Sequence, residues 1–269
     1  MSSAPSADER PERRHLDRAA RVLMPIGVLA LAIAAWGLLV EAYSIPPYVL
    51  PGPGLVLATM WADRALLWDS LMATLATTVE GFALALAGGV GLAVLFNQSR
   101  LLEYSLYPYA IILQVTPVVA IAPLLLIYLP QPLAVLASAW IVAFFPVLAN
   151  TTLGLNSVDR NLADLFALYG ASRWQVLWRL KLPAALPYIL GGMKIAGGLS
   201  LVGAVVAEIA AGSGLAYRIA ESGYRLNILR MFAALALLSA AGIVIFLALS
   251  LLSHLLLRRW HESALAAER

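Results

Sequence analysis

Six apolar runs, each about long enough to cross a lipid bilayer as a helix, dominate this sequence of 269 residues. They cover about residues 22–40, 71–96, 106–129, 133–149, 188–211 and 231–257. A hydrocarbon core of about 30 Å needs about 20 helical residues, and its interior has no water to satisfy an unpaired backbone. Hydrophobic residues make up 62% of the chain and charged residues 12%, unlike a soluble domain. The sequence therefore predicts an all-α, polytopic membrane protein with about six transmembrane helices.

The connections between the runs predict one transmembrane domain over residues 22–257, flanked by tails at 1–21 and 258–269. The run at 22–40 is longer than the 7–15 residues of a signal-peptide core, which favours an uncleaved first span. Four prolines and two glycines at 43–54 predict a loop, followed by a short interfacial helix at 55–68. Pro117 and Pro123 are expected to kink the third span, and residues 212–227 are expected to form a polar loop.

Basic residues gather in alternate connections, which gives the predicted spans an orientation. With the N terminus inside, the inner segments hold Arg10, Arg13, Arg14, Arg18, Arg21, Arg100, Arg160, Arg173, Arg179, Lys181, Arg258 and Arg259. The outer loops hold Arg64, Arg218, Arg225 and Arg230. This excess agrees with the positive-inside rule, so both termini and the segment at 156–187 are expected in the cytoplasm.

The residue types present exclude several classes of site. The chain has no cysteine, so it can form neither a disulfide framework nor a thiolate metal site. His15, His254 and His261 show no ligand spacing, and no metal site is expected. The basic residues form no stripe with interleaved aromatic residues, so nucleic acid is not an expected partner.

The segment 156–187 is charged and punctuated by glycine and proline, unlike the runs on either side. Apolar residues recur at Leu162, Leu165, Phe166 and Tyr169, the spacing of one helical face, and Gly170 then ends the pattern as a C-cap glycine would. These residues predict a short amphipathic helix. An amphipathic pair lying flat on the lipid surface is the alternative.

A second short helix is expected after Gly170. Ser172 and Gln175 fit a capping box, and Trp174, Leu177 and Trp178 share one face of the helix that follows. Pro183 is expected to stop this helix, so that the chain turns before it re-enters the membrane at about residue 187.

This segment resembles the EAA-loop signature of ABC importer permeases, and the residues that match are Asp164, Gly170, Leu180, Leu182 and Pro183. Leu165 and Phe166 stand where that family prefers alanine. Further stretches, at 50–61, 77–94, 116–129, 144–162 and 205–219, are similar in order and spacing to the permeases of the nitrate, sulfonate, taurine and bicarbonate importers. YLPQP at 128–132 replaces the usual glycine-rich turn.

The resemblance implies a type I ABC importer permease in a bacterial inner membrane, with cytoplasmic coupling helices that dock on a separate ATPase subunit. The coupling residues that it implies are Asp164, Gly170, Ser172, Trp174, Leu177, Trp178, Leu182 and Pro183. It also implies a second permease copy and an external substrate-binding protein. The chain has no G-x-x-x-x-G-K-[ST] phosphate loop, so it is not expected to bind ATP or act as an enzyme.

Polar residues inside the spans are candidates for the translocation path, because an ionised carboxylate in hydrocarbon is costly unless it faces water or a partner. The candidates are Glu208, Glu80, Gln114 and Thr116. For each, a structural hydrogen bond between helices is the alternative.

Two other function classes are weighed against the importer subunit. A self-contained channel or secondary transporter would place charges in several spans and need no cytoplasmic docking element. A membrane enzyme would need a catalytic cluster, and none is apparent. The substrate stays open between a small anion, such as nitrate, a sulfonate, taurine or bicarbonate, and a pyrimidine or flavin precursor.

Overall fold

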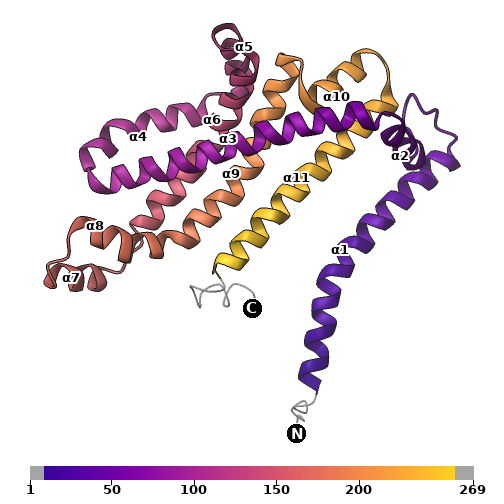
Figure 1. The fold of residues 1–269 in the computed structure, drawn as a ribbon. Coiled ribbons are helices and arrows are strands. Elements are labelled where there is room, and N and C mark those ends of the chain that lie inside the picture. The colour runs from indigo at the N-terminus through magenta and orange to yellow at the C-terminus, as the bar shows by residue number, and fades with distance from the viewer. Residues whose placement is uncertain (1–8, 258–269) are drawn as a thin grey trace.

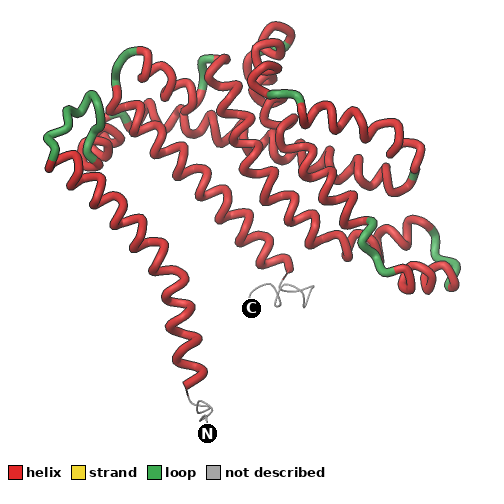
Figure 2. Tube along the Cα trace, turned by 180° about the vertical axis from the view of Figure 1, so that it is seen from behind, coloured by secondary structure: helices red, strands yellow, loops and turns green. Residues whose placement is uncertain are grey.

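The computed structural model describes the backbone of residues 9–257 and the side chains of residues 23–257, so the predicted tail at 258–269 lies outside it. The described part folds into helices without a strand (Figures 1 and 2). The elements are α1 (Glu9–Ala42), α2 (Pro53–Ala62), α3 (Arg64–Gln98), α4 (Arg100–Val115), α5 (Val118–Tyr128), α6 (Gln131–Leu155), α7 (Arg160–Leu168), α8 (Arg173–Val176), a π-helical turn (Leu177–Lys181), α9 (Leu182–Ala211), α10 (Gly214–Tyr224) and α11 (Ile228–Leu257).

Five of the described helical stretches are long and apolar enough to cross a membrane, and a sixth is obtained if α4 and α5 together count as one span. These two helices meet at an angle of 101° around Pro117, whose extended backbone separates them. Pro123 lies inside α5 and does not end it. The predicted all-α membrane fold with about six spans is confirmed, and the third span is broken rather than kinked.

Helices α3, α6 and α9 form the packed centre of the molecule (Figure 1). Glycines let their backbones approach closely: a Cβ at Gly203 on α9 would lie 2.6 Å from the carbonyl oxygen of Ser138 on α6. The Ser200 hydroxyl donates a hydrogen bond of 2.8 Å to the carbonyl oxygen of Thr78 on α3. Small residues and hydrogen bonds between helices are what holds helices together in lipid, where apolar burial alone gives little advantage.

Helix α1 stands apart from this centre, and Figures 1 and 2 show it leaving the bundle beside α2. The apolar part of α1 from Leu23 onward has no buried residue. Its backbone becomes helical at Glu9, so helix α1 extends from the first span back into the predicted N-terminal tail at 1–21. Pro11 is compatible with this helix because it lies in the first turn, where its missing N–H has no partner to lose.

Two connections differ from the sequence prediction. The expected interfacial helix at 55–68 is interrupted at Asp63, and residues from Arg64 onward begin α3. The Asp63 carboxylate accepts a charged hydrogen bond of 2.6 Å from Arg230 at the start of α11, which fixes this break. The expected polar loop at 212–227 contains helix α10, which packs on α3, α9 and α11. Its polar, glycine-containing sequence did not indicate a helix.

The departure YLPQP joins α5 to α6 through a short extended connection. Leu129 and Pro130 are extended, and α6 starts at Gln131. The Gln131 side-chain amide donates a hydrogen bond of 2.8 Å to the carbonyl oxygen of Ala211, at the end of α9. This stretch therefore ties the start of α6 to the end of α9 instead of making a glycine-rich turn.

Candidate functional site

The segment that carries the signature residues connects α6 to α9 and projects from one end of the bundle. In Figures 1 and 2, α7 and α8 lie at the same end as the last turn of α11, whereas α10 lies at the opposite end. Helix α7 has no buried residue; its last residue, Leu168, is 85% exposed, and Tyr169, which follows it, is 83% exposed. Asp164 is also exposed. This segment is held by its own local structure more than by burial.

Caps define the two short helices at the predicted positions. The Asp159 carboxylate accepts a hydrogen bond of 2.8 Å from the Asn161 N–H and starts α7. Gly170 ends it with φ of +66°, a left-handed conformation that residues with a Cβ adopt at a cost. The predicted capping box is present, because Gln175 N–H donates to Ser172 Oγ while Ser172 N–H donates to Gln175 Oε1.

The predicted stop at Pro183 was wrong, because the helix continues from Arg173 to Ala211 without leaving the helical path. A π-helical turn at Leu177–Lys181 precedes the proline. A π-turn shifts the backbone hydrogen-bond pattern by one residue. This shift accommodates Pro183, which has no N–H to donate and whose ring crowds the preceding turn. Leu182 and Pro183 therefore form the first turn of α9.

The expected apolar face of Trp174, Leu177 and Trp178 is divided in the structure. Trp174 and Trp178 are 60% and 65% exposed, but Leu177 is 1% exposed and belongs to the core cluster with residues of α3 and α6. Leu177 therefore anchors the segment to the spans and was wrongly expected on the outer face. A cavity of about 280 Å³ in this segment is lined by Leu165, Phe166, Tyr169, Ala171, Gln175 and Arg179, and neither tryptophan is among its lining residues.

Glu208 lies at the opposite end of the bundle, where it closes the start of α10. Its side chain is 1% exposed, and its carboxylate accepts a hydrogen bond of 3.1 Å from the Ala216 N–H. Gly214, with φ of +73°, lies against this carboxylate, and any Cβ there would overlap it. A carboxylate at a helix N terminus is stabilised by the unpaired N–H groups there. In the described chain, Glu208 is thus a buried cap.

A ring of polar contacts surrounds this cap. The Leu215 N–H donates to Thr74 Oγ1 on α3 at 2.9 Å, and Arg218 Nε donates to Ser70 Oγ at 3.1 Å. Arg218 also donates to Glu221 at 2.8 Å, and this hydrogen bond holds the pKa of the Glu221 carboxyl below its usual value. Sequence reasoning missed Thr74 and Gly214, because neither residue type is unusual in a span or a loop.

The remaining candidates are not brought together by the fold. Glu80 is exposed near the middle of α3. Gln114 is exposed at the end of α4, and the Thr116 hydroxyl donates to the carbonyl oxygen of Ile112 at 2.6 Å beside the α4–α5 break. The described residues contain no group of three or more His, Cys, Asp or Glu that could hold a metal ion.

Comparison with known proteins gives the context of these features. Residues 81–262 match the family model described as "Binding-protein-dependent transport system inner membrane component". The chain is 35% identical over 247 residues to the riboflavin transport system permease protein of Chloroflexus aurantiacus, covering 87% of this chain and 89% of the relative. It is 34% identical over 214 residues to the formylaminopyrimidine transport permease protein of Halalkalibacterium halodurans, covering 78% and 86%.

The fold has a counterpart among solved structures. A crystal structure titled as an amino acid ABC transporter with histidines aligns with a TM-score of 0.62 and 18% identity, covering 75% of this chain and 97% of that one. This match shows a shared helical arrangement. With the family model covering more than half of the sequence, the chain belongs to the binding-protein-dependent transport system inner-membrane components, the non-catalytic permease subunits of ABC importers, in which a separate subunit hydrolyses ATP.

Proposed function

We propose that this permease forms the path for a small nitrogen heterocycle of the flavin- or pyrimidine-precursor class. The observation that carries this proposal is the similarity, over most of both chains, to permeases named for riboflavin and for formylaminopyrimidine. The second candidate is the small-anion class that includes nitrate, taurine and bicarbonate. The charges along the spans provide a way to separate the two classes.

Glu80 supports the heterocycle class. It is exposed on α3 together with Ala73, Ala76 and Ala87, which lie on the same face of the helix. An ionised carboxylate facing lipid is costly, so this face is assigned to a water-filled path. A carboxylate there repels anions and accepts hydrogen bonds from ring N–H groups. Gln114 and Thr116, beside the α4–α5 break, are assigned to the same path, whereas Glu208 is assigned to capping.

Lys194 on α9 is the observation that favours the anion class. It is partly exposed, and its charge is opposite to that of Glu80. If the substrate is an anion, Lys194 is the group that attracts it and Glu80 opposes it. Substituting each residue in turn therefore distinguishes the two substrate classes.

The α7–α8 segment is proposed as the docking element for the ATPase subunit. Trp174 and Trp178 present exposed apolar area, and Arg173 and Arg179 supply exposed charge around them. Trp and Arg are enriched among the residues that dominate binding energy at interfaces. This assignment places α7, α8 and both termini in the cytoplasm, and a second copy of the chain completes the path.

The test is uptake by the purified permease and ATPase reconstituted in liposomes, with the substrate-binding protein added outside. We expect ATP-dependent uptake of riboflavin or formylaminopyrimidine, with E80Q reducing it and K194Q leaving it nearly unchanged. Uptake of taurine or bicarbonate alone, reduced by K194Q, would overturn the heterocycle class. Uptake that needs no ATP would instead point to a channel or secondary transporter.

A further inference from the structure

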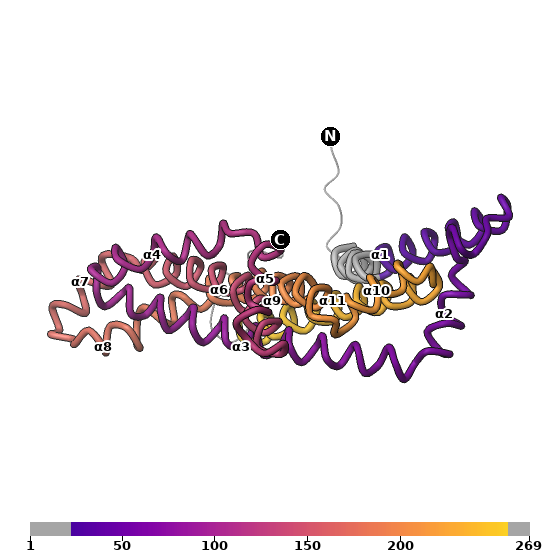
Figure 3. The backbone as a smooth tube through the Cα atoms, turned by 90° about the horizontal axis from the view of Figure 1, so that it is seen from above, coloured from indigo at the N-terminus to yellow at the C-terminus, as the bar shows by residue number. Residues whose placement is uncertain are grey.

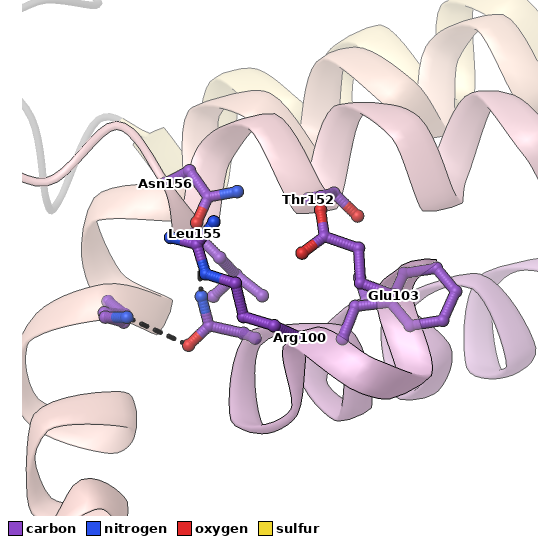
Figure 4. A pocket seen from close by; sticks show the side chains of 9 residues that line it. Arg100, Glu103, Thr152, Leu155 and Asn156 are labelled. Carbon is purple, nitrogen blue, oxygen red and sulfur yellow. Dashed lines mark hydrogen bonds between the residues drawn. The ribbon is translucent and has the colours of Figure 1, made fainter. Parts of the chain in front are cut away.

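A polar cavity of about 310 Å³ lies where α3, α4, α6 and the π-helical turn meet, at the α7–α8 end of the bundle (Figure 4). Its lining residues are Ala93, Phe96, Asn97, Arg100, Glu103, Thr152, Leu155, Asn156 and Lys181. Its volume is at the small end of the range for ligand sites, which suits one charged group. The assigned coupling and path residues do not line it.

Lys181 carries a positive charge into this cavity and forms no ion pair with a carboxylate in the described part of the chain. Its side chain is partly buried, and its ammonium donates a hydrogen bond of 3.0 Å to the neutral Asn97 Oδ1. None of the ion pairs found among the described residues includes Lys181. Arg100 lies close enough for the two positive charges to repel each other. A partly buried ammonium with these neighbours favours an anion beside it.

The other polar groups leave this excess charge in place. Arg100 and Glu103 lie one turn apart on α4, so the Glu103 carboxylate offsets the Arg100 guanidinium more directly than it offsets Lys181. Figure 4 shows Arg100 reaching toward Asn156, with the Glu103 carboxylate on the Thr152 side. One carboxylate thus faces two cations.

Neutral hydrogen-bond donors complete the site, and one of them has no acceptor. The buried Thr152 hydroxyl has no hydrogen-bond partner in the described part of the chain. The Asn97 amide donates to Asn156 Oδ1 at 3.4 Å, which orients both amides along the cavity wall. Ammonium, guanidinium, hydroxyl and amide donors together match an anion that has several oxygens, since charged donors make the strongest hydrogen bonds to phosphate.

We propose that this cavity is an anion site that takes a phosphate group, supplied by a phospholipid headgroup or by free phosphate. At the proposed cytoplasmic end, basic pockets between transmembrane helices lie at the depth of lipid headgroups. The site joins the ends of α3 and α6 to the turn that carries the coupling segment. A bound phosphate therefore stabilises the junction between the coupling segment and the spans, whichever substrate the importer carries.

The experiment uses the whole permease–ATPase complex and two probes. Retention of phosphatidylglycerol from nanodiscs is counted by native mass spectrometry, and binding of inorganic phosphate is measured by equilibrium dialysis. The variants are Lys181→Met, Arg100→Gln and Glu103→Gln, and the control is Arg160→Gln, which removes an exposed charge of α7 outside the cavity. Thermal unfolding is recorded for each variant.

We expect K181M and R100Q each to weaken the bound probe about tenfold or more, E103Q to strengthen it, and R160Q to leave it unchanged. If phosphatidylglycerol follows this order, a lipid headgroup is the source; if inorganic phosphate alone follows it, the source is free phosphate. If wild type, R100Q and E103Q all bind phosphatidylglycerol with the same affinity, and all bind inorganic phosphate with the same affinity, the proposed site is overturned. Because Arg100 is exposed, this comparison decides the matter even if K181M fails to fold.

Discussion

The two ends of the helix bundle differ in whether their prominent side chains are bound within the chain or exposed. At the α10 end, Glu208, Thr74 and Arg218 are all hydrogen-bonded within the chain. At the α7–α8 end, Trp174 and Trp178 are more than half exposed. The first end is closed by its own contacts, and the second offers surface to another molecule. An unusual residue in a sequence therefore does not by itself reveal whether it locks the fold or binds a partner.

The largest expected effect is at the closed end, where Gly214→Ala would separate α10 from Glu208. The new Cβ would overlap the carboxylate and the alanine would have to adopt a positive φ, so the two costs together are about 2–6 kcal/mol in folding free energy. Thermal unfolding in detergent measures this loss. Gly198→Ala is the matched control, because a Cβ there meets no atom within 4 Å. Equal stability of the two variants would show that the cap does not hold this end.

Leu177→Ala tests the one buried residue of the exposed segment. Its side chain lies in the core cluster, so we expect a loss of about 2–5 kcal/mol in stability from the cavity that remains. The measurement is the shift in unfolding temperature. A variant as stable as wild type would contradict the anchor role and return Leu177 to the outer face predicted from the sequence.

Trp178→Ala, at the next residue, is expected to weaken binding of the ATPase subunit and to leave the stability of the permease nearly unchanged. Because the side chain is 65% exposed, the unfolding temperature should change little. Affinity for the ATPase subunit should fall by about 30-fold, corresponding to about 2 kcal/mol for an interface tryptophan. Titration of the detergent-solubilised permease with the ATPase measures it. Unchanged affinity would remove Trp178 from the docking surface.

The smallest effect concerns the partly buried Arg218–Glu221 pair at the α10 end. The folded-state pKa of Glu221 is lowered, so the stability from this pair is present above the ordinary glutamate pKa. This contribution to stability is lost as the pH falls through the lowered folded-state pKa of Glu221. Wild type should thus be slightly more stable than Glu221→Gln at pH 7, and the two should converge in acid. A constant difference in unfolding temperature across this range would contradict the assignment.

The local features of the coupling segment could be predicted from the sequence because each depends on neighbours along the chain. The Ser172–Gln175 capping box and the positive φ of Gly170 need contacts or conformations within a few residues. The continuation through Pro183 could not be predicted in this way. The π-helical turn that accommodates the proline also directs Leu177 into the core formed by α3 and α6.

The path candidates show the same limit. Glu208 and Glu80 were both selected as carboxylates inside apolar runs, yet one is buried as a cap and the other is exposed on α3. Their partners come from distant parts of the chain: Thr74 reaches Leu215 across 141 positions. No local pattern encodes such a contact.

The sequence by itself determined that this chain is a helical membrane protein with a two-helix segment bearing the EAA-like signature. Apolar length, caps and spacing are local properties, and a bilayer requires helices wherever backbone must be satisfied without water. The tertiary structure alone decided that Glu208 locks α10, that Leu177 faces inward while Trp178 faces outward, and that Lys181 lines a cavity with Arg100. These outcomes depend on how α3, α6 and α9 pack, because burial and charge pairing are set by neighbours in space.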